Sequence, residues 1–279
     1  MSEHILKSPR DLRSSGTPFA RLADGIRRQP LVAFFALAFA YSWIPSLTYA
    51  FTGSGPTILS CGPALAAFTV LGLTDGKAGL KRLFRSMLKW RVGLRWWAAA
   101  LLGPAVLAGL ATALNLALGA PTPTAEDLGN WTNVLPTALI ILLVPAIGGA
   151  WEEPGWRGFA LPRLLAERSA LGASLILGTL WAVWHLPVYF VGDQHWSDLV
   201  LVVVGTIVFT WLFQSAGASL LIAMVFHAMN NAVSGEYFSQ MFDGADSTRQ
   251  SWMLVVVWGV AAALVIAFAR HFRRPRETA

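Results

Sequence analysis

Three short motifs place ionisable and amide side chains inside otherwise apolar stretches of the sequence: EEPGWR (152–157), WAVWH (181–185) and HAMNN (227–231). An ionisable group costs at least ~2.5 kcal/mol at the centre of a membrane helix, so such groups persist where they pair or line a hydrated cavity. Carboxylates and imidazoles can activate water, and imidazoles and carboxamides can stabilise an oxyanion. The motifs therefore indicate a functional site.

The first motif holds two adjacent carboxylates that cannot share one task, because neighbouring helical residues point roughly 100° apart. Glu153 and Arg157 are four residues apart on one helix face, so we expect them to pair. That pairing leaves Glu152 free to face a cavity as a general base. A structural ion pair at a helix end would explain Glu153 and Arg157 but not Glu152. A local break or close helix approach is favoured by four nearby residues: Gly148, Gly149, Pro154 and Gly155.

The second motif places His185 in an apolar stretch, with Trp181 one turn earlier on the same helix face. A single histidine in such a position is more often a packing residue whose hydrogen bonds are satisfied locally. Two other buried polar sites in the chain could meet it, and this favours a functional role for His185.

The third motif places His227 and Asn231 four residues apart, so both project from one helix face. Both side chains can donate hydrogen bonds toward one point, as an oxyanion hole requires. The alternative is interhelical hydrogen bonding, worth about 0.6 kcal/mol per bond on average. We favour function for this pair. Asn230 is expected to point elsewhere and to be structural.

The elements that carry these motifs are predicted to be membrane-spanning helices. The 279-residue chain is 55% hydrophobic and only 13% charged, whereas soluble domains carry about 25% charged residues. A membrane helix needs about 20 mainly apolar residues, and most of the apolar stretches reach that length. They are too long for barrel strands, so we expect an all-α polytopic bundle of about eight transmembrane helices. The stretches are 31–52, 56–74, 96–118, 136–162, 171–191, 198–213, 217–235 and 251–269.

The basic residues indicate the orientation of the bundle. If the N-terminus is cytoplasmic, the inside segments hold 20 of the 21 lysines and arginines, and the outside loops hold only Arg249. An even number of spans with both termini cytoplasmic follows. Because the charges flank apolar stretches and do not line one surface, the net charge of +6 does not indicate nucleic-acid binding.

This pattern predicts a cell-membrane, multi-pass protein in three parts. Residues 1–29 form a polar, basic cytoplasmic tail without a signal peptide, 30–270 form the transmembrane domain, and 271–279 form a basic cytoplasmic tail. The motifs define a core at 130–235. Within 77–91, apolar side chains alternate with lysines and arginines at helical spacing, which predicts an amphipathic helix on the anionic lipid surface. Its apolar face would comprise Leu80, Leu83, Phe84, Met87 and Leu88.

The three motifs, in this order and in separate spans, resemble those of the CAAX prenyl endopeptidase and bacteriocin-processing family (CPBP, Abi). The resemblance covers roughly 130–235; one departure is Trp181, where the family more often has phenylalanine. It implies a glutamate-type intramembrane endopeptidase in which Glu152 and His185 activate water. It further implies that His227 and Asn231 stabilise the oxyanion. The implied supporting residues are Glu153, Arg157 and Trp181.

A metal is an open alternative, since family members have also been described as metalloproteases. Glu152, His185 and His227 are plausible zinc ligands, but the chain contains no His-Glu-x-x-His motif. We therefore favour metal-free water activation with no cofactor. A serine nucleophile is disfavoured because Ser219 begins a span and has no motif linking it to a base, and Cys61 is expected to be a small buried hydrophobe.

The expected partners are the lipid bilayer and a peptide or protein substrate that enters from the membrane or the cytosol. Prenylated CAAX tails, leader peptides and bacteriocin precursors are all compatible with the resemblance. Two other functions remain open. One is a non-catalytic immunity or scaffold protein of the same fold, and the other is a proton-coupled transporter. The absence of inverted repeats disfavours transport.

Overall fold

The computed structural model describes residues 18–191 and 194–273, and throughout these ranges the regular structure is helical, with no strand. Five helical segments are long and apolar enough to cross a membrane, and α3 (Gly62–Thr74) is a shorter apolar helix. The prediction of an all-α polytopic membrane bundle is confirmed. The five long segments are α2 (Pro30–Thr52), α5 (Leu94–Ala117), α10 with α11 (Ala170–Val191), α12 (Ser197–Ser215) and α14 (Gly244–Phe268).

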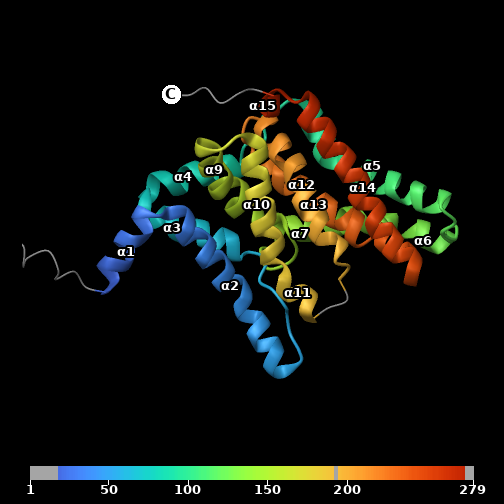
Figure 1. Cartoon of the computed structure of the whole chain (residues 1–279), viewed down its shortest axis with the longest axis horizontal. Coiled ribbons are helices and arrows are strands. Elements are labelled where there is room, and N and C mark those ends of the chain that lie inside the picture. Colours follow the sequence, from blue (N-terminus) through green and yellow to red (C-terminus); the bar gives the residue numbers. More distant parts are fainter. Residues whose placement is uncertain (1–17, 192–193, 274–279) are drawn as a thin grey trace, which may run out of the picture.

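The remaining elements are shorter and connect or cap these spans (Figure 1). Before the first motif they are α1 (Pro18–Arg28), α4 (Gly76–Met87), α6 (Ala125–Gly129), η2 (Asn130–Asn133) and α7 (Val134–Leu143). Around it they are η3 (Ala150–Glu152), α8 (Glu153–Gly155), η4 (Trp156–Ala160) and α9 (Leu161–Glu167). After it they are α13 (Leu220–Asn230), η5 (Asn231–Gly235), η6 (Phe238–Met241) and α15 (Arg270–Arg273).

The apolar stretch 136–162 is not one continuous helix. Helix α7 ends at Leu143, and Val144 is extended, the conformation that a following proline imposes on the residue before it. Gly148 then adopts a φ of 67°, which favours glycine. The chain re-enters helix only at η3, so the first motif begins just after a break.

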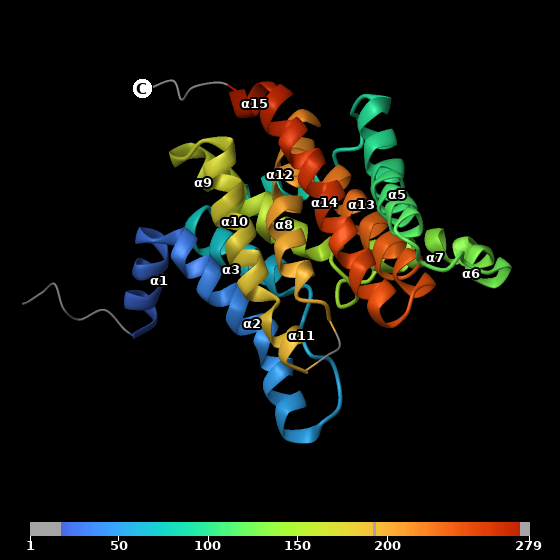
Figure 2. The same ribbon diagram turned by 45° about the vertical axis from the view of Figure 1, so that its right-hand side comes forward.

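The helices around the motifs are packed in two groups. Helix α12 lies between α10 and α14, and α13 packs against α5, α7 and the η3–α8 segment. Helix α3 packs on both α2 and α8. In Figure 2 helix α8 of the first motif lies inside this assembly, with α2 and α3 on one side and α5 and α14 on the other. The helices that carry the first and third motifs are therefore direct neighbours.

The basic segments meet at one end of the bundle. Asp75 accepts hydrogen bonds from Arg82 and lies 4.0 Å from Arg163, which joins α3, α4 and α9. In both ribbon views α9 and α15 lie at the upper end, opposite the far end of α2 and α11 (Figure 2). This grouping agrees with the expected placement of the basic residues on one side of the membrane.

The amphipathic segment is shorter than expected, since α4 ends at Met87. Leu83 and Met87 are buried against the bundle, whereas Phe84 and Leu88 are exposed. The predicted apolar face is therefore divided. One part packs on protein, and the other is available to lipid.

Candidate active site

Glu152 is held by two tryptophans. The Nε1 atoms of Trp156 and Trp181 donate hydrogen bonds to its Oε2 atom at 3.2 and 2.6 Å. The residue is only 4% exposed, and it lines a cavity. The two indoles fix the carboxylate and leave Oε1 without a described protein donor.

Glu153 joins the first motif to the third. Its Oε1 atom accepts hydrogen bonds from Arg157 Nη1 at 2.9 Å and from His227 Nδ1 at 2.7 Å. The expected pairing of Glu153 with Arg157, with Glu152 left to face a cavity, is found in the structure. The contact with His227 links residues 74 positions apart in the sequence.

Arg157 is completely buried between two aromatic rings. Its guanidinium lies 4.3 Å from the Trp181 ring centroid and 4.4 Å from that of Phe209. Stacking of this kind stabilises a desolvated guanidinium. The two rings and Glu153 together fix the position of the Arg157 guanidinium.

His185 lies just after the last residue of α10, and its Nδ1 atom lies 2.8 Å from the carbonyl oxygen of Trp181. A carbonyl oxygen can only accept, so Nδ1 carries the proton in this contact. The neutral ring then presents Nε2 as a hydrogen-bond acceptor. Trp181 thus uses its side chain to fix Glu152 and its backbone to fix His185.

The two asparagines form a short hydrogen-bonded chain. The Ser234 hydroxyl lies 3.5 Å from Asn230 Oδ1, and Asn230 Nδ2 donates to Asn231 Oδ1 at 3.4 Å. Within this row of hydrogen bonds, Asn231 Nδ2 is the donor that remains free. Contrary to expectation, Asn230 does not point elsewhere, because it lines the same cavity as Asn231. The turn at η5 is wider than an α-helical turn, and this brings both amides to one side.

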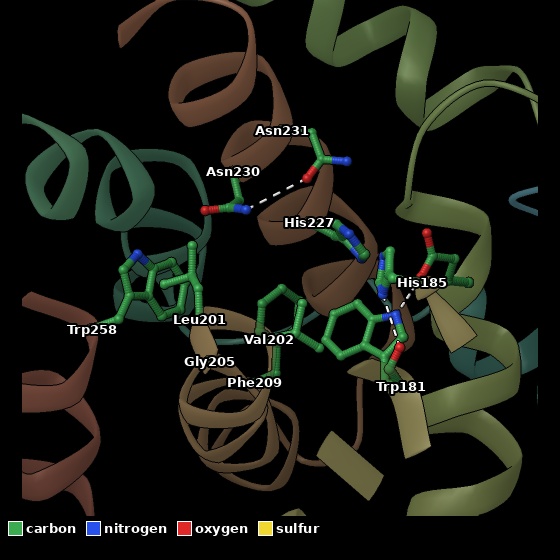
Figure 3. Close-up of a pocket in the computed structure, with 11 residues that line it drawn as sticks. Trp181, His185, Leu201, Val202, Gly205, Phe209, His227, Asn230, Asn231 and Trp258 are labelled. Atoms are coloured by element: carbon green, nitrogen blue, oxygen red, sulfur yellow. Dashed lines mark hydrogen bonds between the residues drawn. The ribbon is translucent and has the colours of Figure 1, made fainter. Parts of the chain in front are cut away.

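The predicted residues meet around one cavity of about 140 Å³. Glu152, His185, His227 and Asn231 all line it, with Trp181 beside them. In the view of Figure 3 the ring of His227 lies between His185 and Asn231, and Trp258 closes the opposite side. The rest of the wall is apolar or aromatic and comes from α12: Leu201, Val202, Gly205 and Phe209.

Glycines make room for this arrangement. A Cβ atom on Gly149 would lie 2.0 Å from His227 Nε2, so the imidazole can occupy its position only because this residue has no side chain. A Cβ atom on Gly155 would lie 2.5 Å from the backbone oxygen of Pro63, where α8 meets α3. The close approach expected from these glycines is present at both positions.

Sequence reasoning missed three residues of the site: Trp156, Phe209 and Asn230. Trp156 could have been found, because it lies four residues after Glu152 and so shares its helix face. Asn230 was expected to point away from the site because a regular α-helix was assumed through residue 231. Phe209 carries no signal in the sequence, since it is one of many apolar residues in α12.

The side chains suggested as zinc ligands do not form a metal cluster in this arrangement. Among the residues that the structure describes, no three histidine, cysteine, aspartate or glutamate side chains converge as a metal site requires. His227 Nε2 is directed at Gly149, and Glu152 Oε2 is occupied by two indole donors. The donor set therefore does not fit a bound zinc ion as it stands.

Comparison with known proteins places the site within a recognised segment. Residues 133–233 match the family model described as "Type II CAAX prenyl endopeptidase Rce1-like". The chain is also 28% identical over 146 residues to a protein of Methanococcus maripaludis named CAAX prenyl protease 2, a match that covers 47% of this chain and 52% of that protein. The match thus spans about half of each chain. The resemblance inferred from the three motifs is confirmed by this match, and the matched segment carries Glu152, His185, His227 and Asn231.

Proposed function

We propose that this protein is an intramembrane endopeptidase of the cell membrane that hydrolyses a peptide bond near the C-terminus of a prenylated or otherwise membrane-associated substrate. The observation that carries the proposal is the convergence of a carboxylate, two imidazoles and a carboxamide on one cavity within a membrane bundle. The family match of 133–233 and the name of the archaeal relative support the same activity.

Water activation is assigned to Glu152 and His185. Glu152 Oε1 accepts a proton from the water while the indoles hold Oε2, and His185 Nε2 accepts a hydrogen bond from the second O–H of that water. The water oxygen then forms a bond with the substrate carbonyl carbon. Both acceptors are fixed before the substrate arrives, which lowers the cost of reaching the reactive geometry.

Stabilisation of the tetrahedral oxyanion is assigned to Asn231 and His227. Asn231 contributes its free Nδ2–H, and His227 contributes Nε2–H after a small movement away from Gly149. Because Nδ1 of His227 already donates to Glu153, Nε2 can donate only when the ring is an imidazolium. With Glu152 and Glu153 ionised, Arg157 and an imidazolium at His227 make the buried cluster neutral, which limits its desolvation cost.

Collapse of the intermediate completes the reaction. The carbon–nitrogen bond breaks, and the leaving amine takes the proton that Glu152 received from water. The products are a new carboxyl group on the shortened substrate, which releases its proton to the surrounding water, and a released peptide with a free amino group. Every step uses residues of this chain, and none is routed through a metal.

The proposal is tested by peptide cleavage with the purified full-length protein in liposomes. Prenylated and unprenylated peptides with a CAAX-type C-terminus are supplied, and the products are identified by mass spectrometry. Glu152→Gln is expected to lower kcat by about 10²–10⁴-fold, the contribution of a general base. The matched control is Glu126→Gln, an exposed carboxylate in α6, which should retain wild-type turnover.

Two results would overturn the proposal. If Glu152→Gln cleaves as fast as wild type, the water-activation assignment fails. If the wild-type protein cleaves no peptide of either class, the non-catalytic scaffold interpretation replaces the protease. A preference for the prenylated peptides in kcat/KM would assign the lipid modification to the recognised part of the substrate.

A further inference from the structure

A second, larger cavity lies on the other side of the bundle from α10. It has a volume of about 800 Å³ and is lined by apolar side chains of α5, α12, α13 and α14. Several of its lining residues are strongly exposed, including Leu102 at 61%, Val106 at 58% and Phe268 at 70%. The cavity is therefore a groove open to the surroundings of the bundle, which are lipid for a membrane protein.

Hydrogen bonds between described residues of α5 and α14 join the two helices at one end. At that end Asn115 donates to the Asp246 carbonyl at 3.1 Å, and Gln250 donates to Thr112 Oγ1 at 2.9 Å. The groove is lined by the opposite halves of the two helices, around 98–107 and 261–269. Figure 2 shows α5 and α14 diverging toward the end of the bundle where α15 lies.

The open end of the groove is positively charged. Arg95 precedes the α5 lining residues by one helical turn, and Arg270 directly follows Ala269, the lining residue just after α14; both arginines are exposed. The guanidinium of Arg95 lies 4.7 Å from the ring centroid of Trp96, and Trp96 contacts Trp211, which lines the groove. The sequence segments 88–118, 205–230 and 250–273 contain no acidic residue to offset these charges.

We propose that this groove binds one anionic glycerophospholipid. An acyl chain lies along the apolar wall formed by α5, α12, α13 and α14, and the phosphate is bound at the end of the groove where Arg95 and Arg270 lie. Tryptophans at the same level, Trp96 and Trp211, match the usual position of aromatic side chains at a membrane interface. Apolar walls and basic residues at one level are the two features that a phospholipid requires.

The groove and the catalytic cavity are separated by a single aromatic layer. Phe226 lines the groove, and its ring lies 4.8 Å from that of Phe209 and 5.9 Å from that of Trp258, both of which line the catalytic cavity. Phe226 also directly precedes His227. A lipid chain in the groove would support the outer face of this layer, but it would not enter the catalytic cavity. The site is thus distinct from the place where a peptide bond would be hydrolysed.

Lipid binding is measured directly by native mass spectrometry on the purified full-length protein. Phosphatidylglycerol and phosphatidylcholine with identical acyl chains are added separately to the detergent-solubilised protein. One phosphatidylglycerol molecule is expected to remain bound at concentrations where phosphatidylcholine dissociates. Arg95→Gln and Arg270→Gln should each weaken phosphatidylglycerol binding by about fivefold, the factor expected for one basic residue at a lipid headgroup. The charge-matched control is Lys77→Gln on α4, an exposed lysine outside the groove, which should leave binding unchanged.

A second variant tests the acyl chain independently of charge. Ala99→Trp places a large side chain in the groove and should abolish retention of the lipid, whereas Ala36→Trp on the exposed face of α2 should not. Equal retention of the two lipids, or unchanged binding in both the arginine and Ala99→Trp variants, would overturn the proposal. Displacement of bound phosphatidylglycerol by farnesol alone would also overturn it and would assign the groove to an isoprenoid chain.

Discussion

The indole nitrogen of Trp181 lies 2.6 Å from Oε2 of Glu152, although the two residues are 29 positions apart and belong to different helices. This contact connects the second motif to the first, as the contact between Glu153 and His227 connects the first to the third. A phenylalanine at position 181 could not make it, because a phenyl ring has no N–H group. The tryptophan that departs from the usual family pattern is therefore one of the two residues that position the proposed general base, together with Trp156.

Trp181→Phe tests this positioning role. The phenyl ring can keep the stacking contact with Arg157 but removes the donor to Glu152. A hydrogen bond to a charged group contributes about 1.5–3 kcal/mol, so we expect kcat to fall roughly 10- to 100-fold with little change in KM. Steady-state cleavage kinetics provide the measurement. Wild-type kcat in this variant, with the protein folded, would show that the contact does not position Glu152.

Gly149→Ala should inactivate the protein although it adds a single methyl group. The new Cβ atom would overlap the His227 ring, forcing it away and breaking its 2.7 Å contact with Glu153. We expect at least about a hundredfold loss of kcat, the cost of removing one oxyanion-hole donor. Gly72→Ala in α3 is the control, because no atom lies within 4 Å of its Cβ position. Equal activity of the two variants would contradict the proposed position of the His227 ring against Gly149.

Helical spacing was sufficient to predict the local contacts of the site. The Glu153–Arg157 pair and the Trp181–His185 contact both join residues four apart, the spacing that places side chains on one helix face. The polarity of the three motifs within apolar stretches predicted that they would meet. These inferences need only the period of the helix and the cost of an unpaired charge in lipid.

The contacts between helices could not be predicted in this way. Nothing in the spacing indicates that His227 bonds Glu153 or that its ring lies on Gly149, since both depend on how α13 packs against the first motif. A local break was expected among Gly148, Gly149, Pro154 and Gly155, and it occurs at Val144 to Gly149, which includes the first two of these residues but not Pro154. Pro154 is accommodated in the first turn of α8, where a missing N–H is tolerated. Asn230 was misassigned because the wide turn at η5 changes the direction of the side chains.

Arg157→Met should destabilise the fold because it removes one of the two hydrogen-bond partners of the buried Glu153 carboxylate. Both side chains are 0% exposed, and breaking a buried ion pair costs about 3–5 kcal/mol. A lower denaturation temperature in detergent micelles would report this loss. Arg82→Met is the control, because Arg82 is 63% exposed and its pair with Asp75 should contribute no more than about 1 kcal/mol. If the two variants unfold at the same temperature, the buried cluster does not stabilise the bundle.

Removal of divalent metals should leave peptide cleavage unchanged. The proposed mechanism uses Glu152 and His185 as proton and hydrogen-bond acceptors, and among the described residues the suggested zinc ligands do not form a group that could hold a metal ion, although they line one cavity. The purified protein is treated with 1,10-phenanthroline, and its zinc content is measured by elemental analysis before and after treatment. Loss of activity on treatment, restored by stoichiometric zinc, would replace metal-free water activation with the metalloprotease alternative.

Asn231→Ala and Asn230→Ala should both lower kcat, and the loss should be larger for Asn231→Ala. Asn231 presents the free Nδ2–H, so its loss removes an oxyanion donor and should lower kcat by about 10²–10³-fold with KM little changed. Asn230 acts through Asn231 by donating to its Oδ1 atom, so its removal frees the Asn231 amide to rotate and should lower kcat by a smaller factor. In the Asn231→Ala background the amide that Asn230 orients is gone, so adding Asn230→Ala should lower kcat no further. Independent, multiplying losses in the double variant would instead show that Asn230 contacts the substrate directly, and an unchanged kcat in Asn231→Ala would remove this residue from the oxyanion hole.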